Sequence, residues 1–202
     1  MNFLAHLYLS GKNKEILIGN FIGDYVKGKE YLYYPENIRK GILLHRFIDS
    51  FTDQHPITKK SRKRISSNYS KYSGIVIDIF YDYFLANDWD NYYPEPLEDF
   101  VEDVFSILKS YYFTFPQGIR NWFPNFLRNN WLVTYSSIDG IEKVLHRMSS
   151  RTSLPDFTSF AIHVLKEQEV ELKQEFAEFF HLITDYVVKE HGLYPGEQLK
   201  IT

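Results

Sequence analysis

Two aspartates, Asp78 and Asp82, stand out in a stretch that is otherwise almost entirely apolar or aromatic, IVIDIFYDYFLA. Residues four apart stack on one face of a helix, and a helix that is apolar all round is normally buried. Two stacked carboxylates lose hydration there and repel each other unless something positive faces them. The sequence leaves two partners open, a metal ion or a clamp from Arg46, Lys27 or Arg39, and the spacing favours the metal.

A second group of polar residues follows the spacing i, i+4, i+8 in the segment GILLHRFIDSFTD: His45, Asp49 and Asp53. The apolar residues of this segment fall on the opposite face of the predicted helix. A histidine and a carboxylate one turn apart can share a metal ion or a proton. The more common interpretation of such a face is the solvated side of an amphipathic helix, and this helix alone does not decide between the two.

The segment LIGNFIGDYVKG places Asn20 and Asp24 one turn apart, with Lys27 three residues further on. Gly19 and Gly23 flank them, and residues without a side chain permit the close approach of another element or a ligand. The alternative is a tight helix contact with a surface Asp–Lys pair.

Another histidine, His6, lies in the apolar segment NFLAHLYLS and by itself is more typical of a hydrogen-bonded core residue. The first 82 residues together contain six chemically competent side chains in apolar or small-residue contexts: His6, Asp24, His45, Asp49, Asp78 and Asp82. Imidazoles and carboxylates without a thiolate suit Mn²⁺, Fe or Mg²⁺, with Zn²⁺ as an alternative. We therefore expect a metal site.

Five positive charges follow within six residues, at Lys59, Lys60, Arg62, Lys63 and Arg64. Most charge runs of this kind form the solvated start of a helix. The functional alternative is a docking patch for an acidic partner.

The composition limits the function classes further. The chain has 202 residues with 44% apolar and 18% aromatic content, enough for a large core, and a formal charge of −3 that gives no case for nucleic-acid binding. The absence of cysteine excludes disulfides and thiolate metal sites and fits a reducing compartment. No signal peptide and no apolar run of about 18 residues is present, so we expect a cytoplasmic protein without a membrane span. The oligomeric state stays open.

Helical spacing runs through nearly the whole chain and predicts one all-α domain over residues 1–202, a multi-helix bundle. Pro56 should end the helix before it, and Gly192 should cap the last helix. The expected helices cover 2–9, 13–27, 35–53, 57–69, 73–88, 96–112, 117–132, 136–149 and 156–190.

Several long blocks in order resemble the bacterial acyl carrier protein phosphodiesterase family, also called holo-acyl carrier protein hydrolase. The blocks are MNFLAHLYLSG, LIGNFIGDYVKG, GILLHRFIDSFTDQHP, IDIFYDYFLANDW and WLVTYSSIDGIEKVLHRMSSR. They cover most of the chain and are more specific than any single motif above. Beyond Arg151 the resemblance is only to a long helix.

The resemblance implies an all-α fold distantly related to the HD-type metal phosphohydrolases, and an activity that depends on a divalent metal, usually Mn²⁺ or Mg²⁺. The implied reaction hydrolyses the phosphodiester between 4′-phosphopantetheine and a serine of acyl carrier protein. The family motif falls on His6, Asp24, His45, Arg46, Asp49, Asp78 and Asp82. No histidine in this chain is followed directly by an aspartate, so the ligand set of ordinary HD enzymes cannot be transferred.

The roles that follow are hypotheses. Metal ligands are expected at Asp24, His45, Asp78 and Asp82, and Asp49 either joins them or orients His45. The expected general acid or further ligand is His6, and the expected contacts to phosphoryl oxygens are Arg46 and Lys27. The basic run at 59–64 would dock the acidic carrier. Two alternatives stay open: a metal hydrolase for nucleotides or other small phosphodiesters, and a non-catalytic carrier-binding protein.

Overall fold

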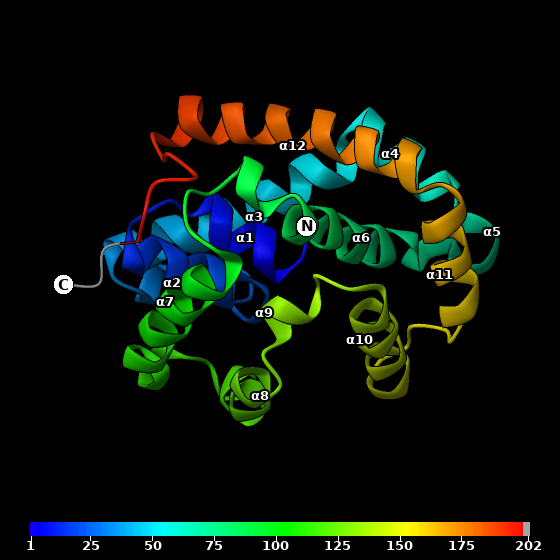
Figure 1. The fold of residues 1–202 in the computed structure, drawn as a ribbon. Coiled ribbons are helices and arrows are strands. Elements are labelled where there is room, and N and C mark those ends of the chain that lie inside the picture. The colour runs from blue at the N-terminus through cyan, green and yellow to red at the C-terminus, as the bar shows by residue number, and fades with distance from the viewer. Residues whose placement is uncertain (200–202) are drawn as a thin grey trace.

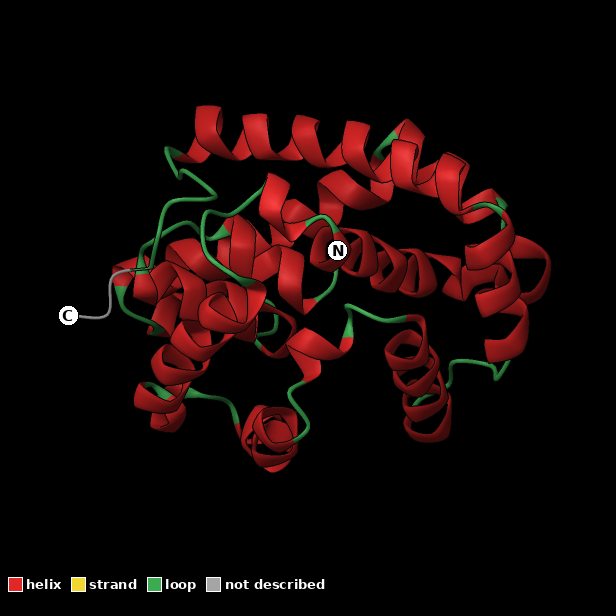
Figure 2. Cartoon of the chain, viewed as in Figure 1, coloured by secondary structure: helices red, strands yellow, loops and turns green. Residues whose placement is uncertain are grey.

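The computed structural model describes residues 1–199, and within them the chain consists of helices joined by turns and loops, with no β-strand (Figure 2). This confirms the predicted all-α class. The remaining three residues of the predicted 1–202 domain lie outside the described part.

The helices are as follows, with 3₁₀ helices marked η: α1 Phe3–Leu9, α2 Lys14–Ile22, η1 Gly23–Tyr25, η2 Glu30–Tyr33, α3 Glu36–Gln54, α4 Pro56–Lys63, α5 Ser66–Tyr69, η3 Ser70–Tyr72, α6 Ser73–Asn87, η4 Trp89–Asn91, α7 Leu97–Ser110, η5 Tyr112–Thr114, α8 Gln117–Arg128, α9 Trp131–Thr134, α10 Ile138–Arg151, α11 Thr158–Glu167 and α12 Glu169–His191. In Figure 1, α12 runs along one edge of the molecule, α8 and α10 lie at the opposite edge, and α1, α3 and α6 lie between them.

Two local predictions are confirmed. Helix α3 ends just before Pro56, which opens α4 at its first position, where a proline costs no hydrogen bond. Gly192 follows α12 with φ of +63°, the left-handed conformation that favours glycine at a helix end.

Three predicted helices are interrupted, and a fourth, 13–27, is α-helical only to Ile22 and continues as the 3₁₀ helix η1. The segment 57–69 divides into α4 and α5, in a serine- and asparagine-rich sequence whose side chains compete for backbone hydrogen bonds. The segment 117–132 divides at Asn130, whose φ is +43°. The segment 156–190 divides at Gln168, because α11 packs against α10 whereas α12 packs against α4 and α6. Helix propensity is a weak prior, and here tertiary packing overrides it.

The closest helix pair, α2 and α3, depends on two glycines. A Cβ on Gly19 would lie 2.0 Å from the Ile38 carbonyl oxygen, and one on Gly41 would lie 2.1 Å from that of Ile16. No other residue permits this approach, which brings the polar face of α2 to that of α3.

Helix α6 is the buried centre of the fold, as its sequence predicts. All of its side chains from Ile79 to Ala86 are buried, and the helix contacts α1, α4, α10 and α12. Burial on this scale is the dominant stabilising contribution in a fold of this size.

Within residues 1–199, none of the helices combines the length and the apolar character that a membrane crossing requires. The cytoplasmic location stays a prediction.

Candidate active site

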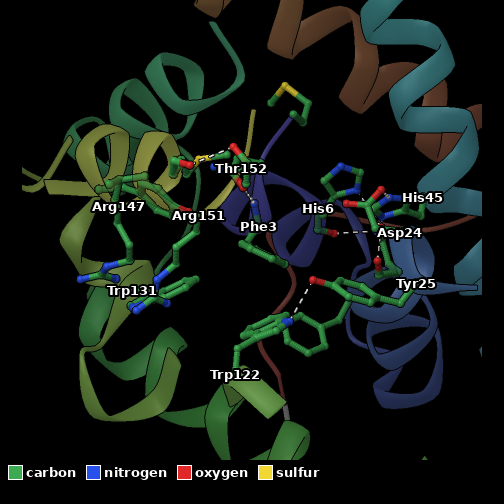
Figure 3. Close-up of a pocket in the computed structure, with 17 residues that line it drawn as sticks. Phe3, His6, Asp24, Tyr25, His45, Trp122, Trp131, Arg147, Arg151 and Thr152 are labelled. Atoms are coloured by element: carbon green, nitrogen blue, oxygen red, sulfur yellow. Dashed lines mark hydrogen bonds and ion pairs between the residues drawn. The ribbon is translucent and has the colours of Figure 1, made fainter. Parts of the chain in front are cut away.

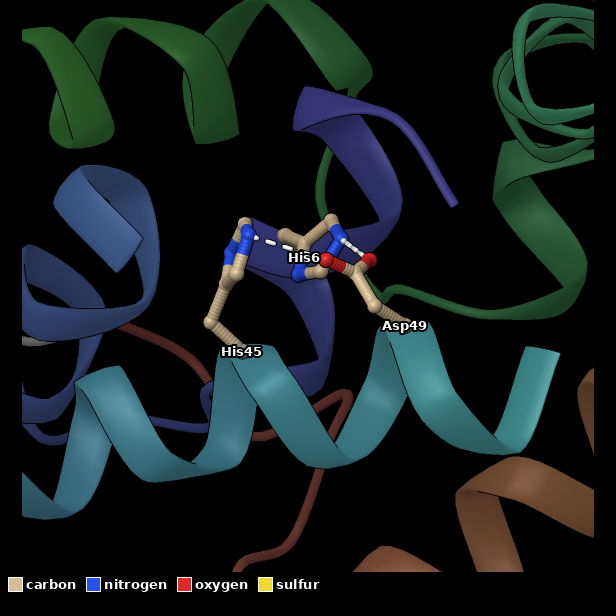
Figure 4. A group of neighbouring side chains, drawn as sticks. All are labelled: His6, His45 and Asp49. Atoms are coloured by element: carbon tan, nitrogen blue, oxygen red, sulfur yellow. Dashed lines mark ion pairs between the residues drawn. The ribbon is translucent and has the colours of Figure 1, made fainter. Parts of the chain in front are cut away.

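Three side chains from two helices meet at one point: His6 of α1, and His45 and Asp49 of α3 (Figure 4). The Asp49 carboxylate lies 3.2 Å from Nε2 of His6 through one oxygen and 3.2 Å from Nε2 of His45 through the other. The imidazole rings stack with their centroids 4.2 Å apart. Each of the three offers one ligand atom, and these atoms all lie within 4.8 Å of one another, close enough for one metal ion to be held by all three.

The part of this α3 face that carries His45 is not solvated, whereas the side chains of Asp49 and Asp53 are 42% and 66% exposed. The side chain of His45 is only 8% exposed, because the face lies against α1, α2 and η1. Gly23 makes room for the ring, since a Cβ there would lie 2.3 Å from Cγ of His45. The amphipathic-surface interpretation of His45 is therefore wrong.

One residue, Asn20, fixes the protonation of both rings. Its Nδ2 donates to the His6 carbonyl at 2.7 Å and to Ser10 Oγ at 2.9 Å, so its Oδ1 is free to accept from His6 Nδ1 at 2.8 Å. The main-chain oxygen of Asn20 lies 2.8 Å from His45 Nδ1. Both Nδ1 atoms therefore carry hydrogen, and in a neutral imidazole Nε2 is then a lone-pair nitrogen.

Each Nε2 atom thus faces an oxygen of Asp49. A lone pair and a carboxylate oxygen repel each other unless a proton or a metal ion lies between them. Burial, followed by the charge of His45, lowers the pKa of His6. Burial also acts to lower the pKa of His45, but Asp24 and Asp49 outweigh it and raise that pKa to about 9. Protonation of His45 Nε2 satisfies one of these contacts. Protonation of His6 as well would place two cationic rings with their centroids 4.2 Å apart. Nε2 of His45 is buried and forms no hydrogen bond of good geometry with the described residues, so the donor set fits a divalent cation.

Asp24 lies at the edge of this group, with Oδ1 3.3 Å from Nε2 of His45 and a side chain that is 68% exposed. The contact with His45 is the main cause that lowers the pKa of Asp24, so the carboxylate is ionised at neutral pH.

The two aspartates of α6 face two different positive groups. Asp78 Oδ1 lies 3.1 Å from the Met1 α-ammonium. Asp82 accepts from the main-chain N–H groups of Leu4 at 2.7 Å and Ala5 at 3.2 Å, which are unpaired donors of the first turn of α1. Neither contact is the metal ion that the spacing favours, nor the alternative clamp from Arg46, Lys27 or Arg39. The metal-ligand roles of both aspartates stay predictions.

The other basic candidates lie outside the histidine group. Arg46 donates to the carbonyls of Val26 at 2.7 Å and Gly28 at 2.9 Å and so holds the loop after η1. Lys27 donates to the carbonyl of Asp24. Both side chains have partners within the protein, and their predicted contacts with phosphoryl oxygens remain untested.

Most of the basic run is also paired. Lys60 lies 3.1 Å, and Arg64 2.5 Å, from the buried Glu175 of α12, and Arg62 lies 2.5 Å from Asp53. The other two cations of the run, Lys59 and Lys63, are exposed and form no ion pair within residues 1–199.

Two cavities lie beside the histidine group and share Met1 and Asp24 in their linings. The first, of about 470 Å³, has an aromatic wall and is also lined by His6, Asp24 and His45 (Figure 3). Its aromatic residues are Phe3, Phe21, Tyr25, Trp122, Trp131 and Tyr135. The second, of about 530 Å³, is polar and is lined by Asp24, Asp49, Asp53, Arg62, Lys71 and Asp78, among others. Both volumes lie within the range of roughly 300–1,000 Å³ that is typical of small-molecule sites.

Sequence reasoning missed the residues that complete the aromatic cavity, Arg147 and Arg151 of α10, and the tryptophans Trp122 and Trp131. Their signal was present as an i, i+4 arginine pair in a resembling block, but nothing in the spacing indicates that α10 faces α1. The part of Asn20 in orienting both histidines was also missed.

Comparison with known proteins gives a consistent result. The family model described as "Acyl carrier protein phosphodiesterase" matches residues 1–183. Curated proteins with the same name include one from Pectobacterium atrosepticum, 35% identical over 75% of this chain and 79% of the relative, and one from Yersinia pestis, 30% identical over 89% of this chain and 94% of the relative. A third, from Escherichia coli O157:H7, is 32% identical over 89% of this chain and 94% of the relative.

No solved structure gives a significant match, so the distant likeness to HD-type enzymes stays a prediction. The extent of the family match and the identity of these relatives leave no doubt about the relationship: this chain belongs to the acyl carrier protein phosphodiesterase family.

Proposed function

We propose that this protein hydrolyses the phosphodiester that joins 4′-phosphopantetheine to a serine of acyl carrier protein. The bond between phosphorus and the serine oxygen breaks, water supplies the oxygen that ends on phosphorus, and a proton ends on the serine oxygen. The observation that carries the proposal is the meeting of His6, His45 and Asp49, where the Nε2 atoms of two buried imidazoles face one carboxylate beside two cavities.

The proposed metal-binding residues are His6, His45 and Asp49, with Asp24 and Asp78 as the neighbouring carboxylates. A divalent metal held there would supply an activated water and neutralise charge at phosphorus. Mn²⁺ or Mg²⁺ is the proposed ion, and Fe or Zn²⁺ is the alternative for a mixed imidazole and carboxylate set.

The chain's own residues orient the reaction. Asn20 holds both imidazoles by their Nδ1 atoms, which keeps both Nε2 atoms directed at Asp49. Asp24 is ionised and lines both cavities, where it can accept a proton from the attacking water. Asp82 contributes indirectly, because it accepts hydrogen bonds from the first turn of the helix that carries His6.

Acyl carrier protein is the proposed macromolecular partner. We assign its docking mainly to Lys59 and Lys63, the exposed cations of the basic run, since Lys60 and Arg64 neutralise a buried glutamate. Arg62 connects this run with the polar cavity that it lines. Exposed cations of this kind steer an acidic partner and act mainly on the association rate.

The test is incubation of purified holo-acyl carrier protein with this protein and Mn²⁺, followed by intact-mass measurement of the carrier. Loss of the 4′-phosphopantetheine mass is the expected result. An unchanged carrier, with protein that is folded and loaded with metal, contradicts the proposal.

A second candidate is hydrolysis of a nucleotide phosphodiester, which the aromatic cavity favours because a base stacks on aromatic rings. Turnover of a nucleotide panel beside the carrier assay separates the two substrates. The non-catalytic alternative predicts no turnover of either substrate and no bound metal.

A further inference from the structure

The aromatic cavity extends well beyond the histidine group, and the proposed hydrolysis involves only the part lined by His6, Asp24 and His45. In Figure 3, Arg147, Arg151 and Trp131 lie on one side of Phe3, and His6, Asp24 and His45 lie on the other. The far side of the cavity is therefore built from α9 and α10, elements that contribute nothing to the histidine group.

The far side offers positive charge without a carboxylate partner. Arg147 and Arg151 are one turn apart on α10, so both side chains extend from one face of the helix. The guanidinium of Arg147 lies 4.8 Å from the ring centroid of Trp131. Within residues 1–199, neither arginine takes part in an ion pair or donates a side-chain hydrogen bond to a protein acceptor. Their donors are available to a ligand.

The two tryptophans add a third free donor. Trp122 and Trp131 stack with centroids 5.8 Å apart and an interplanar angle of 3°. Nε1 of Trp122 donates to the hydroxyl of Tyr25 at 2.9 Å, whereas Nε1 of Trp131 is buried and has no partner among residues 1–199. A buried N–H without an acceptor is costly, so an oxygen of a bound molecule would stabilise this arrangement.

The ligand that fits is a flexible chain rich in acceptor oxygens, with apolar groups between them and an anionic end at the histidine group. We propose that the aromatic cavity binds the 4′-phosphopantetheine arm itself, so that the enzyme recognises the prosthetic group as well as the carrier. The phosphate end lies at His6, Asp24 and His45. The two amide carbonyls and the hydroxyl of the arm accept from Arg147, Arg151 and Trp131 Nε1. This proposal rests on the proposed function.

The fluorescence of the tryptophans that line the cavity can report ligand binding. Two of the three tryptophans of the chain line the cavity, and the third, Trp89, is buried elsewhere with its Nε1 bound to the Glu95 carbonyl. Free 4′-phosphopantetheine, free pantetheine and adenosine monophosphate are titrated separately into the full chain while tryptophan fluorescence is recorded. Each titration is performed with a chelator and again with Mn²⁺, and none contains carrier protein.

The expected result is a saturable change with both pantetheine compounds, the phosphorylated one binding more tightly. Arg147→Ala and Arg151→Ala should each weaken binding by about tenfold, as the loss of a charged hydrogen bond does. Lys143→Ala is the matched control, because Lys143 is exposed on the same helix and does not line the cavity. It should bind like wild type. Arg147→Lys keeps the charge but loses the planar fork, and it should fall between wild type and Arg147→Ala.

No fluorescence change with either pantetheine compound, or equal binding by wild type and both arginine variants, overturns the proposal. Tighter binding of adenosine monophosphate than of 4′-phosphopantetheine also overturns it, and identifies a nucleotide pocket instead. The arm site and the proposed hydrolysis can be contradicted independently. If apo-carrier protein forms but the free arm does not bind, only the arm site is contradicted. Arm binding without apo-carrier formation removes only the hydrolysis.

Discussion

Two His–Asp pairs in this protein have the same spacing and nearly the same local geometry. His45 and Asp49 on α3, and His181 and Asp185 on α12, are each four residues apart, with Nε2–Oδ2 distances of 3.2 and 3.4 Å. Their surroundings differ completely, because the side chain of His45 is 8% exposed and that of His181 is 75% exposed. Only the first pair has the further partners His6 and Asn20.

The comparison separates what spacing contributes from what burial contributes. An exposed i, i+4 pair shares its charges with solvent and is worth a few tenths of a kcal/mol, roughly. In the first pair the imidazole is buried and only the carboxylate, 42% exposed, reaches solvent, so the charge on His45 must be balanced by groups that the fold holds in place. Chemistry is expected at the pair with the buried imidazole, and the exposed pair provides a control on the same chain.

The largest expected difference between the pairs is in turnover. Asp49→Asn removes the charge that faces both Nε2 atoms and should lower kcat/KM by about a thousandfold, near 4 kcal/mol of transition-state stabilisation. Asp185→Asn should leave kcat/KM unchanged. Rates of apo-carrier formation, followed by intact mass, measure both, and equal rates for the two variants would remove Asp49 from the site.

The second difference is in the pH dependence of stability without metal. The pKa of His45 is raised to about 9, so its contribution is fully present below the unfolded value near 6.5 and is lost as the pH rises through 9. The free energy of unfolding of wild type relative to His45→Gln should fall by up to about 3 kcal/mol across this interval. Urea unfolding in chelator from pH 6 to 10 measures it.

For the exposed pair we expect no such loss. His181→Gln should follow the wild-type curve throughout, because the ring and its aspartate are both largely in solvent. A difference between wild type and His45→Gln that does not change with pH would contradict the assigned charge of His45.

The third difference is in the response to metal. A cation that binds only the folded state at a hundred times its Kd stabilises by about 2.7 kcal/mol, or roughly 5–10 °C in Tm for a chain of this size. Wild type and Asp185→Asn should show this rise with Mn²⁺, and Asp49→Asn should not. The measurement is differential scanning fluorimetry with and without Mn²⁺, and an equal rise in Asp49→Asn would place the ion elsewhere.

The sequence predicted the helices, and the proximity of His45 and Asp49, for physical reasons that are local. The 3.6-residue period, Pro56 and Gly192 depend on neighbours along the chain, and so does the i, i+4 stacking of His45 and Asp49. The partners of Asp82 could not be predicted this way. They are main-chain N–H groups 77 and 78 residues distant, and main-chain donors leave no trace in the residue types.

The aromatic cavity was missed for the same reason. The break at Asn130 and the packing of α9 and α10 bring Arg147 to Trp131, and neither event can be read from the period of a helix. The broken helix at Gln168 shows the opposite error, where a continuous helical pattern was assumed to be one rod. Local rules predicted that His45 and Asp49, which share a helix, lie together, and these rules failed where segments far apart in sequence meet.

The smallest expected effect concerns Asp82, which holds the helix that carries His6, the partner of the His45–Asp49 pair. Asp82→Asn leaves one first-turn N–H of α1 facing an amide instead of a carboxylate oxygen, and should cost about 1–2 kcal/mol of unfolding free energy. Because α1 carries His6, Mn²⁺ should also bind more weakly, although Asp82 lines neither cavity. Denaturant unfolding and metal titration measure the two effects, with Asp185→Asn as the control that changes neither. If Asp82→Asn instead abolishes metal binding while stability is kept, Asp82 is a ligand after all. The metal site would then include a buried residue of α6, whereas the exposed pair on α12 has no such additional residue.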